Sequence, residues 1–174
     1  IDIKGFEFDL TAAVTNELTI GGSFVYLDTK IQNLLQSCFI DQLSANTVPG
    51  CVIDSDGNGT PDTQDVSGNP ATNTPEFSFN VYAAFDIPTQ GMPFDFYGLV
   101  NYSYKDDIQF TLNQDDLQRQ KGYGLLDITL GLKDKNDRYE VYIYGKNVFD
   151  KFYVTESFEA FGALGRKVIR VPRG

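Results

Sequence analysis

Apolar and polar residues alternate along most of this chain, and this period of two constrains its fold more than any other feature. In the segment GFEFDLTAAV (5–14), Phe6 and Phe8 alternate with Glu7 and Asp9. Successive side chains of a β-strand point to opposite faces of a sheet, whereas an α-helix repeats every 3.6 residues. The pattern therefore predicts strands that each have one apolar and one polar face.

The same alternation predicts seven strands of roughly 8 to 12 residues. They cover residues 5–14, 18–28, 76–87, 94–105, 122–132, 138–147 and 166–171. Short connections lie near 14–17, 87–93 and 133–137, and long ones cover about 31–75, 106–121 and 148–165. Short turns at one end and long loops at the other are typical of a transmembrane β-barrel, whose tilted strands need about 9–11 residues to cross a bilayer.

A soluble β-sandwich also alternates, so two further features decide the interpretation. The apolar face is rich in Phe and Leu with Tyr near the strand ends, as in an aromatic girdle. The opposite face carries charges in the middle of strands, at Glu7, Asp9 and Asp127, which suits a water-filled lumen. Seven strands alone would leave two bare edges, and bacterial single-chain barrels have even counts. We therefore expect an all-β, antiparallel transmembrane barrel segment within a larger closed sheet.

Charge and composition exclude several classes of function. The formal net charge is −10, with 14 Lys and Arg against 24 Asp and Glu, and the chain has no His. Nucleic-acid binding needs a basic surface, so nucleic acid is not an expected partner. The lack of His removes Ser-His and Cys-His catalysis, and the chain is not expected to be an enzyme. The acidic pairs Asp106-Asp107 and Asp115-Asp116 are interpreted as solvated loop charge, because nothing around them indicates burial.

The C-terminal strands resemble those of a known family. The stretch YGLLDITLGLKDKNDRYEVYIYGKNVFDKFY is similar to the last strands of TonB-dependent outer-membrane receptors, in which an xLGL strand, a turn and a KNxxDxxY motif follow in order. The hairpin in 5–31 and the strand NTPEFSFNVYAAFDIP are similar to earlier elements of that family. The chain ends in RVPRG, where the family has a terminal aromatic residue, and it lacks the family's plug domain and TonB box.

The resemblance implies that residues 1–174 form the C-terminal part of a barrel of 22 strands. It implies a place in the bacterial outer membrane, with the long loops at the cell surface and the C-terminus in the periplasm. The function expected from it is uptake of a scarce nutrient, such as an iron–siderophore complex. The implied partners are outer-membrane lipid, upstream strands and plug, the TonB complex and a small-molecule ligand. The alternative is a secreted or surface-exposed, calcium-binding structural or adhesive β-rich module.

The long connection 31–75 contains an acidic run, DSDGNGTPDTQD (54–65), that matches a calcium-binding loop. Such loops place oxygen ligands at alternate positions and a glycine at the sharp turn. The candidate ligands are Asp54, Asp56, Asn58, Thr60 (through its carbonyl), Asp62 and Asp65. The last position is Asp rather than Glu, so we expect a structural site with a Kd on the order of 10⁻⁴–10⁻³ M. The alternative is that Asp, Asn and Gly simply form good surface turns.

The same connection holds the only two cysteines, Cys38 and Cys51. The surface of an outer membrane is oxidising, so we expect a local disulfide, with two unpaired thiols as the alternative. Apolar residues recur at helical spacing just before it, at Ile31, Leu34, Leu35, Cys38 and Phe39. This spacing predicts a short amphipathic helix that packs against its own loop, with capping of the vestibule or packing on a neighbouring molecule as the alternatives.

Overall fold

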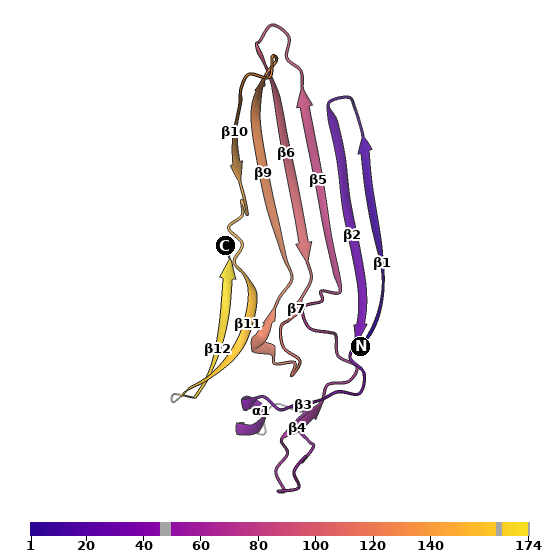
Figure 1. Ribbon diagram of the computed structural model, residues 1–174, viewed down its shortest axis with the longest axis vertical. Coiled ribbons are helices and arrows are strands. Elements are labelled where there is room, and N and C mark those ends of the chain that lie inside the picture. Colours follow the sequence, from indigo (N-terminus) through magenta and orange to yellow (C-terminus); the bar gives the residue numbers. More distant parts are fainter. Residues whose placement is uncertain (46–49, 163–164, 174) are drawn as a thin grey trace.

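The computed structural model describes residues 1–45, 50–162 and 165–173. Its centre is a six-stranded antiparallel sheet in the order β1-β2-β5-β6-β9-β10 (Figure 1). The strands are β1 (Asp2–Ala13), β2 (Leu18–Lys30), β5 (Phe77–Ile87), β6 (Phe94–Lys105), β9 (Tyr123–Asp134) and β10 (Glu140–Gly145). Each long strand pairs with the next long strand in sequence, as in an up-and-down barrel wall. The first six predicted strands are therefore confirmed.

The shorter elements lie at one end of this sheet, opposite the short turns (Figure 1). The connection after β2 holds β3 (Leu35–Ser37), α1 (Ile40–Ala45) and β4 (Thr63–Asp65). The connection after β6 holds β7 (Ile108–Gln109), the 3-10 helix η1 (Asp116–Gln118) and β8 (Arg119–Gln120). Within the described ranges, no helix is long and apolar enough to cross a membrane.

The C-terminal region differs from the prediction. The predicted loop 148–165 contains β11 (Tyr153–Gly162), which pairs with β12 (Gly165–Arg173) in a separate hairpin. The chain between β10 and β11 bends at Asn147 and Asp150, which both have a positive φ of 48°. β12 contains the seventh predicted strand, 166–171, and runs antiparallel to β11, with Arg173 paired to Tyr153.

The register places most of the large apolar residues of the sheet on one face. Phe8 lies opposite Phe24, which lies opposite Phe79, and this row continues to Tyr104 in β6. The shared face, called the apolar belt below, comprises Phe6, Phe8, Leu10, Leu18, Ile20, Phe24, Tyr26, Phe77, Phe79, Val81, Ala83, Phe85, Ile87, Phe96, Val100, Tyr102, Tyr104, Leu126, Ile128, Leu130, Leu132, Val141 and Ile143. The other face holds the polar residues that alternate with them and a smaller number of apolar ones, such as Ile3 and Leu99. The period of two in the sequence thus becomes a two-faced wall.

Aromatic rings cover glycines on neighbouring strands at several places in this wall. Tyr82 lies over Gly21 and Tyr97 over Gly131, and each ring occupies the space where a Cβ of the glycine would stand. Phe85 covers Gly98 in the same way on the opposite face. Cross-strand contacts of this kind fix the register, because a shift by one residue would move each ring to the wrong face.

Candidate functional site

A row of aromatic rings crosses the apolar belt near the long-loop end of the sheet. Phe77 opens β5 directly after the long connection, and its ring centroid lies 5.2 Å from that of Tyr104 near the end of β6. The row runs Phe6–Phe24 (5.6 Å), Phe24–Phe77 (6.5 Å), Phe77–Tyr104, Tyr104–Phe79 (5.5 Å) and Phe79–Tyr102 (6.0 Å). Rings gathered at this level of an apolar wall are typical of a membrane-interface girdle.

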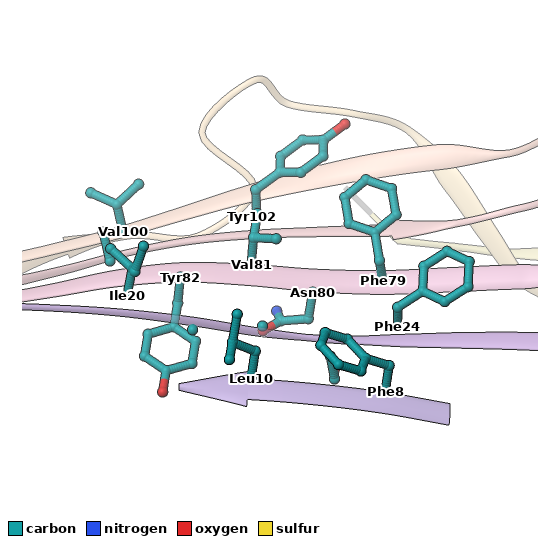
Figure 2. Close-up of a pocket in the computed structure, with 14 residues that line it drawn as sticks. Phe8, Leu10, Ile20, Phe24, Phe79, Asn80, Val81, Tyr82, Val100 and Tyr102 are labelled. Carbon is teal, nitrogen blue, oxygen red and sulfur yellow. The ribbon is translucent and has the colours of Figure 1, made fainter. Parts of the chain in front are cut away.

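Smaller aliphatic residues form the next level of the belt and leave a hollow of about 630 Å³. Its lining includes Phe8 and Phe79 from the aromatic level and Leu10, Ile20 and Val81 from the aliphatic level (Figure 2). The hollow exists because Gly22 and Ala83 are small and stand among these larger side chains. Val81 is 48% exposed, so the belt has no cover within the described part of the chain.

The opposite face of the wall carries a hydrogen-bonded polar ladder. The Asn80 amide donates to Oδ1 of Asn101 at 2.6 Å, and Thr11 Oγ1 lies 3.2 Å from the Tyr82 hydroxyl. Asp127 stands beside Asn101 in the register and accepts a 2.8 Å hydrogen bond from the main-chain N–H of Asn147. Glu7, Asp9 and Asp127 were predicted to share a polar face, and the register places them there. This face suits contact with water or polar protein and not with hydrocarbon.

Hydrogen bonds join the two long loops into a single cap on the sheet. The buried Gln42 amide donates to Gln64 Oε1 at 3.0 Å, and the Gln64 amide in turn donates to the main-chain carbonyl of Asn113 at 2.9 Å. The main-chain N–H of Asn73 also donates to the Gln109 carbonyl at 2.9 Å. Nothing in the local sequence around these glutamines distinguishes them from solvated loop residues, so their role is visible only in three dimensions.

A polar cavity of about 230 Å³ opens where this cap meets the sheet. Its lining includes the carboxylates of Asp28, Glu76, Asp106 and Asp107 together with Arg119. Arg119 pairs with Asp107 at 2.8 Å, and Asp107 also accepts a hydrogen bond from the main-chain N–H of Gly122 at 2.6 Å. Asp107 is therefore a structural acceptor rather than free loop charge.

The second acidic pair corrects the sequence interpretation more strongly. Asp115 is only 2% exposed, and its side chain caps η1 by accepting a 3.0 Å hydrogen bond from the N–H of Leu117. A carboxylate at a helix start satisfies an otherwise unpaired amide, which accounts for its burial. Asp116 lies next to it and lines a separate polar cavity of about 380 Å³.

The disulfide prediction is confirmed, and the helix prediction is wrong in its position. Cys38 and Cys51 form a disulfide with Cα atoms 5.7 Å apart. Leu35 lies in β3 and pairs with Asp65 of β4, so the segment that ends at Phe39 is not helical, and α1 begins only at Ile40. Ile31 and Phe39 are buried as expected, because the loop folds back over them. Part of the connection, residues 46–49, lies outside the described residues.

The predicted calcium ligands form a turn in which carboxylates accept hydrogen bonds from the main chain. Asp54 accepts from the N–H groups of Gly59 (2.7 Å), Gly57 (2.8 Å) and Asn58 (3.2 Å), and the Gly59 bond is the main reason that the pKa of Asp54 is lowered. Asn58 Oδ1 accepts from the Thr60 N–H at 2.8 Å.

The remaining acidic residues of this turn have similar partners. The Ser55 hydroxyl donates to Asp62 at 2.8 Å and lowers the pKa of Asp62, and the Ser67 hydroxyl does the same for Asp65. Asp56 accepts from Asn58 at 2.9 Å. Among the described side chains, no three carboxylates or thiols are grouped to hold a metal ion. Calcium binding at these six residues remains a prediction, and its donor set is one that a hard cation accepts.

Comparisons with known proteins agree with this geometry. Residues 1–148 match the model of the family described as TonB dependent receptor-like, beta-barrel. The chain therefore belongs to the β-barrel family of TonB-dependent receptors. No curated protein sequence matches it significantly.

Three solved structures share the fold. The ferric yersiniabactin uptake receptor FyuA from Yersinia pestis has a TM-score of 0.63 and 16% identity, covering 99% of this chain and 23% of that one. The siderophore receptor PiuA from Acinetobacter baumannii has a TM-score of 0.60 and 16% identity, and the match covers 97% of this chain and 20% of the receptor. The ferric preacinetobactin receptor BauA from Acinetobacter baumannii has a TM-score of 0.56 and 17% identity, and the match covers 98% of this chain and 20% of the receptor. The chain thus spans about a fifth to a quarter of each structure.

Proposed function

We propose that this chain forms part of the barrel wall of an outer-membrane transporter that takes up a scarce nutrient. The observation that carries the proposal is the two-faced wall. The apolar belt with its aromatic row lies on one face, and the hydrogen-bonded polar ladder lies on the other. A closed barrel turns such a belt toward lipid and the ladder toward its lumen. In this arrangement the loop cap lies at the cell surface and the short turns lie in the periplasm.

The wall acts together with parts that lie outside these strands. β1 and β10 are the edges of the six-stranded sheet, and their unpaired main-chain groups need neighbouring strands in a membrane, where water cannot satisfy them. Upstream strands of the same barrel are the proposed neighbours of β1. A plug in the lumen, against the polar ladder, and the TonB complex that supplies energy complete the proposed assembly.

An iron–siderophore complex is the proposed substrate class. The support is the fold shared with three receptors whose described ligands are ferric siderophores or siderophores. Identities of 16–17% show the fold alone, so the substrate has to be established by transport measurements.

The test uses cells that carry or lack the intact protein. Outer-membrane fractions are analysed by gel with and without heating, and uptake of ⁵⁵Fe is measured with a panel of siderophores under iron limitation. We expect a heat-shifted band well above 19.4 kDa in the outer membrane and loss of uptake of one ferric siderophore on deletion. A stable, water-soluble species of 19.4 kDa would instead favour the calcium-binding surface module.

A further inference from the structure

The acidic turn contains the one Asn-Gly step of the sequence, Asn58–Gly59, and both residues are exposed. At such a step the main-chain nitrogen of the glycine can attack the side-chain amide carbon of the asparagine, because no Cβ obstructs its approach. Gly59 has a positive φ of 87°, and no atom lies within 4 Å of the place that a Cβ would take. The step is therefore open both to this attack and to water.

Two hydrogen bonds hold the Asn58 side chain against the Gly59 peptide. Asn58 Oδ1 accepts a 2.8 Å hydrogen bond from the main-chain N–H of Thr60, which closes a ring across Gly59. Asn58 Nδ2 donates at 2.9 Å to Asp56, so both polar atoms of the amide are held. The amide carbon is thus kept close to the Gly59 nitrogen, and the entropy of orienting the two groups is already lost in the folded turn.

The nucleophile in this turn already contacts a base. The Gly59 N–H donates to Asp54 Oδ2 at 2.7 Å, which is within reach for a general base. A second bond from the Gly57 N–H, at 2.8 Å, helps to fix that carboxylate. The Thr60 N–H, which now bonds the Asn58 carbonyl oxygen, would also stabilise the negative charge that develops there during attack. The turn therefore brings together a nucleophile, a base and an oxyanion donor.

We propose that Asn58 is a site of self-catalysed deamidation. The Gly59 nitrogen bonds to Asn58 Cγ and gives its proton to Asp54. The bond from Cγ to Nδ2 then breaks, and the side-chain nitrogen takes up that proton and leaves as ammonia. The product is a cyclic imide between the two residues. Water opens the imide at the side-chain carbonyl to give aspartate, or at the main-chain carbonyl to give isoaspartate.

Both products change the acidic turn irreversibly. Each adds one negative charge, and isoaspartate also lengthens the main chain by one methylene between residues 58 and 59. The aspartate product keeps an oxygen donor at this position of the predicted calcium loop, whereas isoaspartate displaces it. This inference depends on the geometry of the turn and not on the proposed transport function.

The test is peptide mapping by mass spectrometry of the intact receptor, incubated at neutral pH with a chelator so that no cation takes the same oxygens. We expect Asn58 to convert faster than in a synthetic peptide of residues 52–66. Asp54→Asn keeps the shape of the side chain and removes its basicity, and fragmentation assigns the loss to Asn58 alone. This variant should slow the loss about tenfold, below the roughly 10²–10⁴-fold typical of a general base, because hydroxide also reaches an exposed turn.

Ser55→Ala is the matched control for loosening of the turn. It removes the 2.8 Å hydrogen bond from the Ser55 hydroxyl to Asp62 and leaves the partners of Asn58 and Gly59 in place. Its rate should stay close to that of the wild type. A wild-type rate no faster than the peptide would overturn the proposal, as would equal rates in the wild type and Asp54→Asn. Equal slowing by Asp54→Asn and Ser55→Ala would also overturn it, because order in the turn would then matter and the base would not.

Discussion

The side-chain amide of Gln64 donates a 2.9 Å hydrogen bond to the main-chain carbonyl of Asn113, and this contact ties the two long loops of the wall together. Gln64 is buried, and its Oε1 also accepts a hydrogen bond from Gln42, so both the oxygen and the nitrogen of its side-chain amide are hydrogen-bonded. The two loops are 49 residues apart in sequence at this point. Their contact makes the loop cap one structural unit, and changes in one loop should be felt in the other.

Gln64→Ala should loosen both loops. The substitution leaves the Asn113 carbonyl and the Gln42 amide without these partners, at a cost of about 1–3 kcal/mol for local opening. Hydrogen exchange should become faster in residues 106–121 as well as in 61–66, while the strands are unchanged. Gln90→Ala, an exposed glutamine in the opposite turn, serves as the control. Faster exchange confined to residues 61–66 would show that the loops are independent.

Gly131→Val should destabilise the wall by colliding with the Tyr97 ring. The ring fills the position of the missing Cβ, so the larger side chain has to displace it, at a cost on the order of 1–3 kcal/mol. The measurement is urea-induced unfolding followed by the loss of heat-shifted gel mobility. Tyr97→Ala/Gly131→Val removes the ring and should recover part of the loss. Equal effects of Gly131→Val with and without Tyr97 would contradict the predicted contact.

Arg138→Ala should lower the thermal stability of the turn after β9. Arg138 Nε and Nη2 each donate a 2.8 Å hydrogen bond to the carboxylate of Asp134, which is fully buried. Removing the guanidinium leaves that carboxylate without its charged partner. Lys133→Ala, at the end of β9, breaks an exposed ion pair with Asp137 and is expected to have little effect. A melting temperature that falls equally in the two variants would contradict this ranking.

Calcium should protect the acidic turn from proteolysis. To bind the ion, the oxygens of Asp54, Asp56 and Asn58 would have to turn away from their present main-chain partners. We expect half-maximal protection at about 10⁻⁴–10⁻³ M calcium. Asp56→Asn should raise that concentration, and Asp116→Asn, outside the turn, should not. An unchanged cleavage rate across the titration would remove calcium from the account and leave the turn as a hydrogen-bonded loop.

Acid should loosen the same turn. The folded pKa values of Asp54 and Asp62 lie below the ordinary value of 3.8, because each carboxylate accepts several hydrogen bonds. Their contribution to stability is therefore fully present above the unfolded pKa and is lost as the pH falls through the lowered folded pKa. Cleavage by pepsin within residues 52–66 should accelerate only when the pH drops below about 3.8. Acceleration well above this pH, relative to an unfolded peptide of the same sequence, would mean that these bonds do not hold the turn.

The sequence predicted the wall better than the cap, for a physical reason. A strand that faces two different environments has to alternate, so residues such as Phe77 and Phe79 indicate their face directly. β11 was missed because its sequence, YVTESFEAFG, mixes apolar and polar residues on both faces. The helix predicted from Ile31 onward was wrong because buried loop residues need no period. The burial of Asp115 and the linkage through Gln64 depend on contacts between distant segments, which a local pattern does not contain.

The central claim is that one face of this wall meets lipid and the other meets the lumen, and adjacent residues of β5 test it directly. The two cysteines of these 174 residues are joined in the disulfide and leave no free thiol among them, so single cysteines introduced at Val81 and Tyr82 can carry nitroxide labels. Electron paramagnetic resonance in liposomes then compares relaxation by oxygen, which concentrates in lipid, with relaxation by a water-soluble nickel chelate. The account predicts that the label at Val81 is relaxed mainly by oxygen. It predicts that oxygen relaxes the label at Tyr82 far less. Nickel access to the label at Val81 equal to that of a surface loop would contradict a lipid-facing belt.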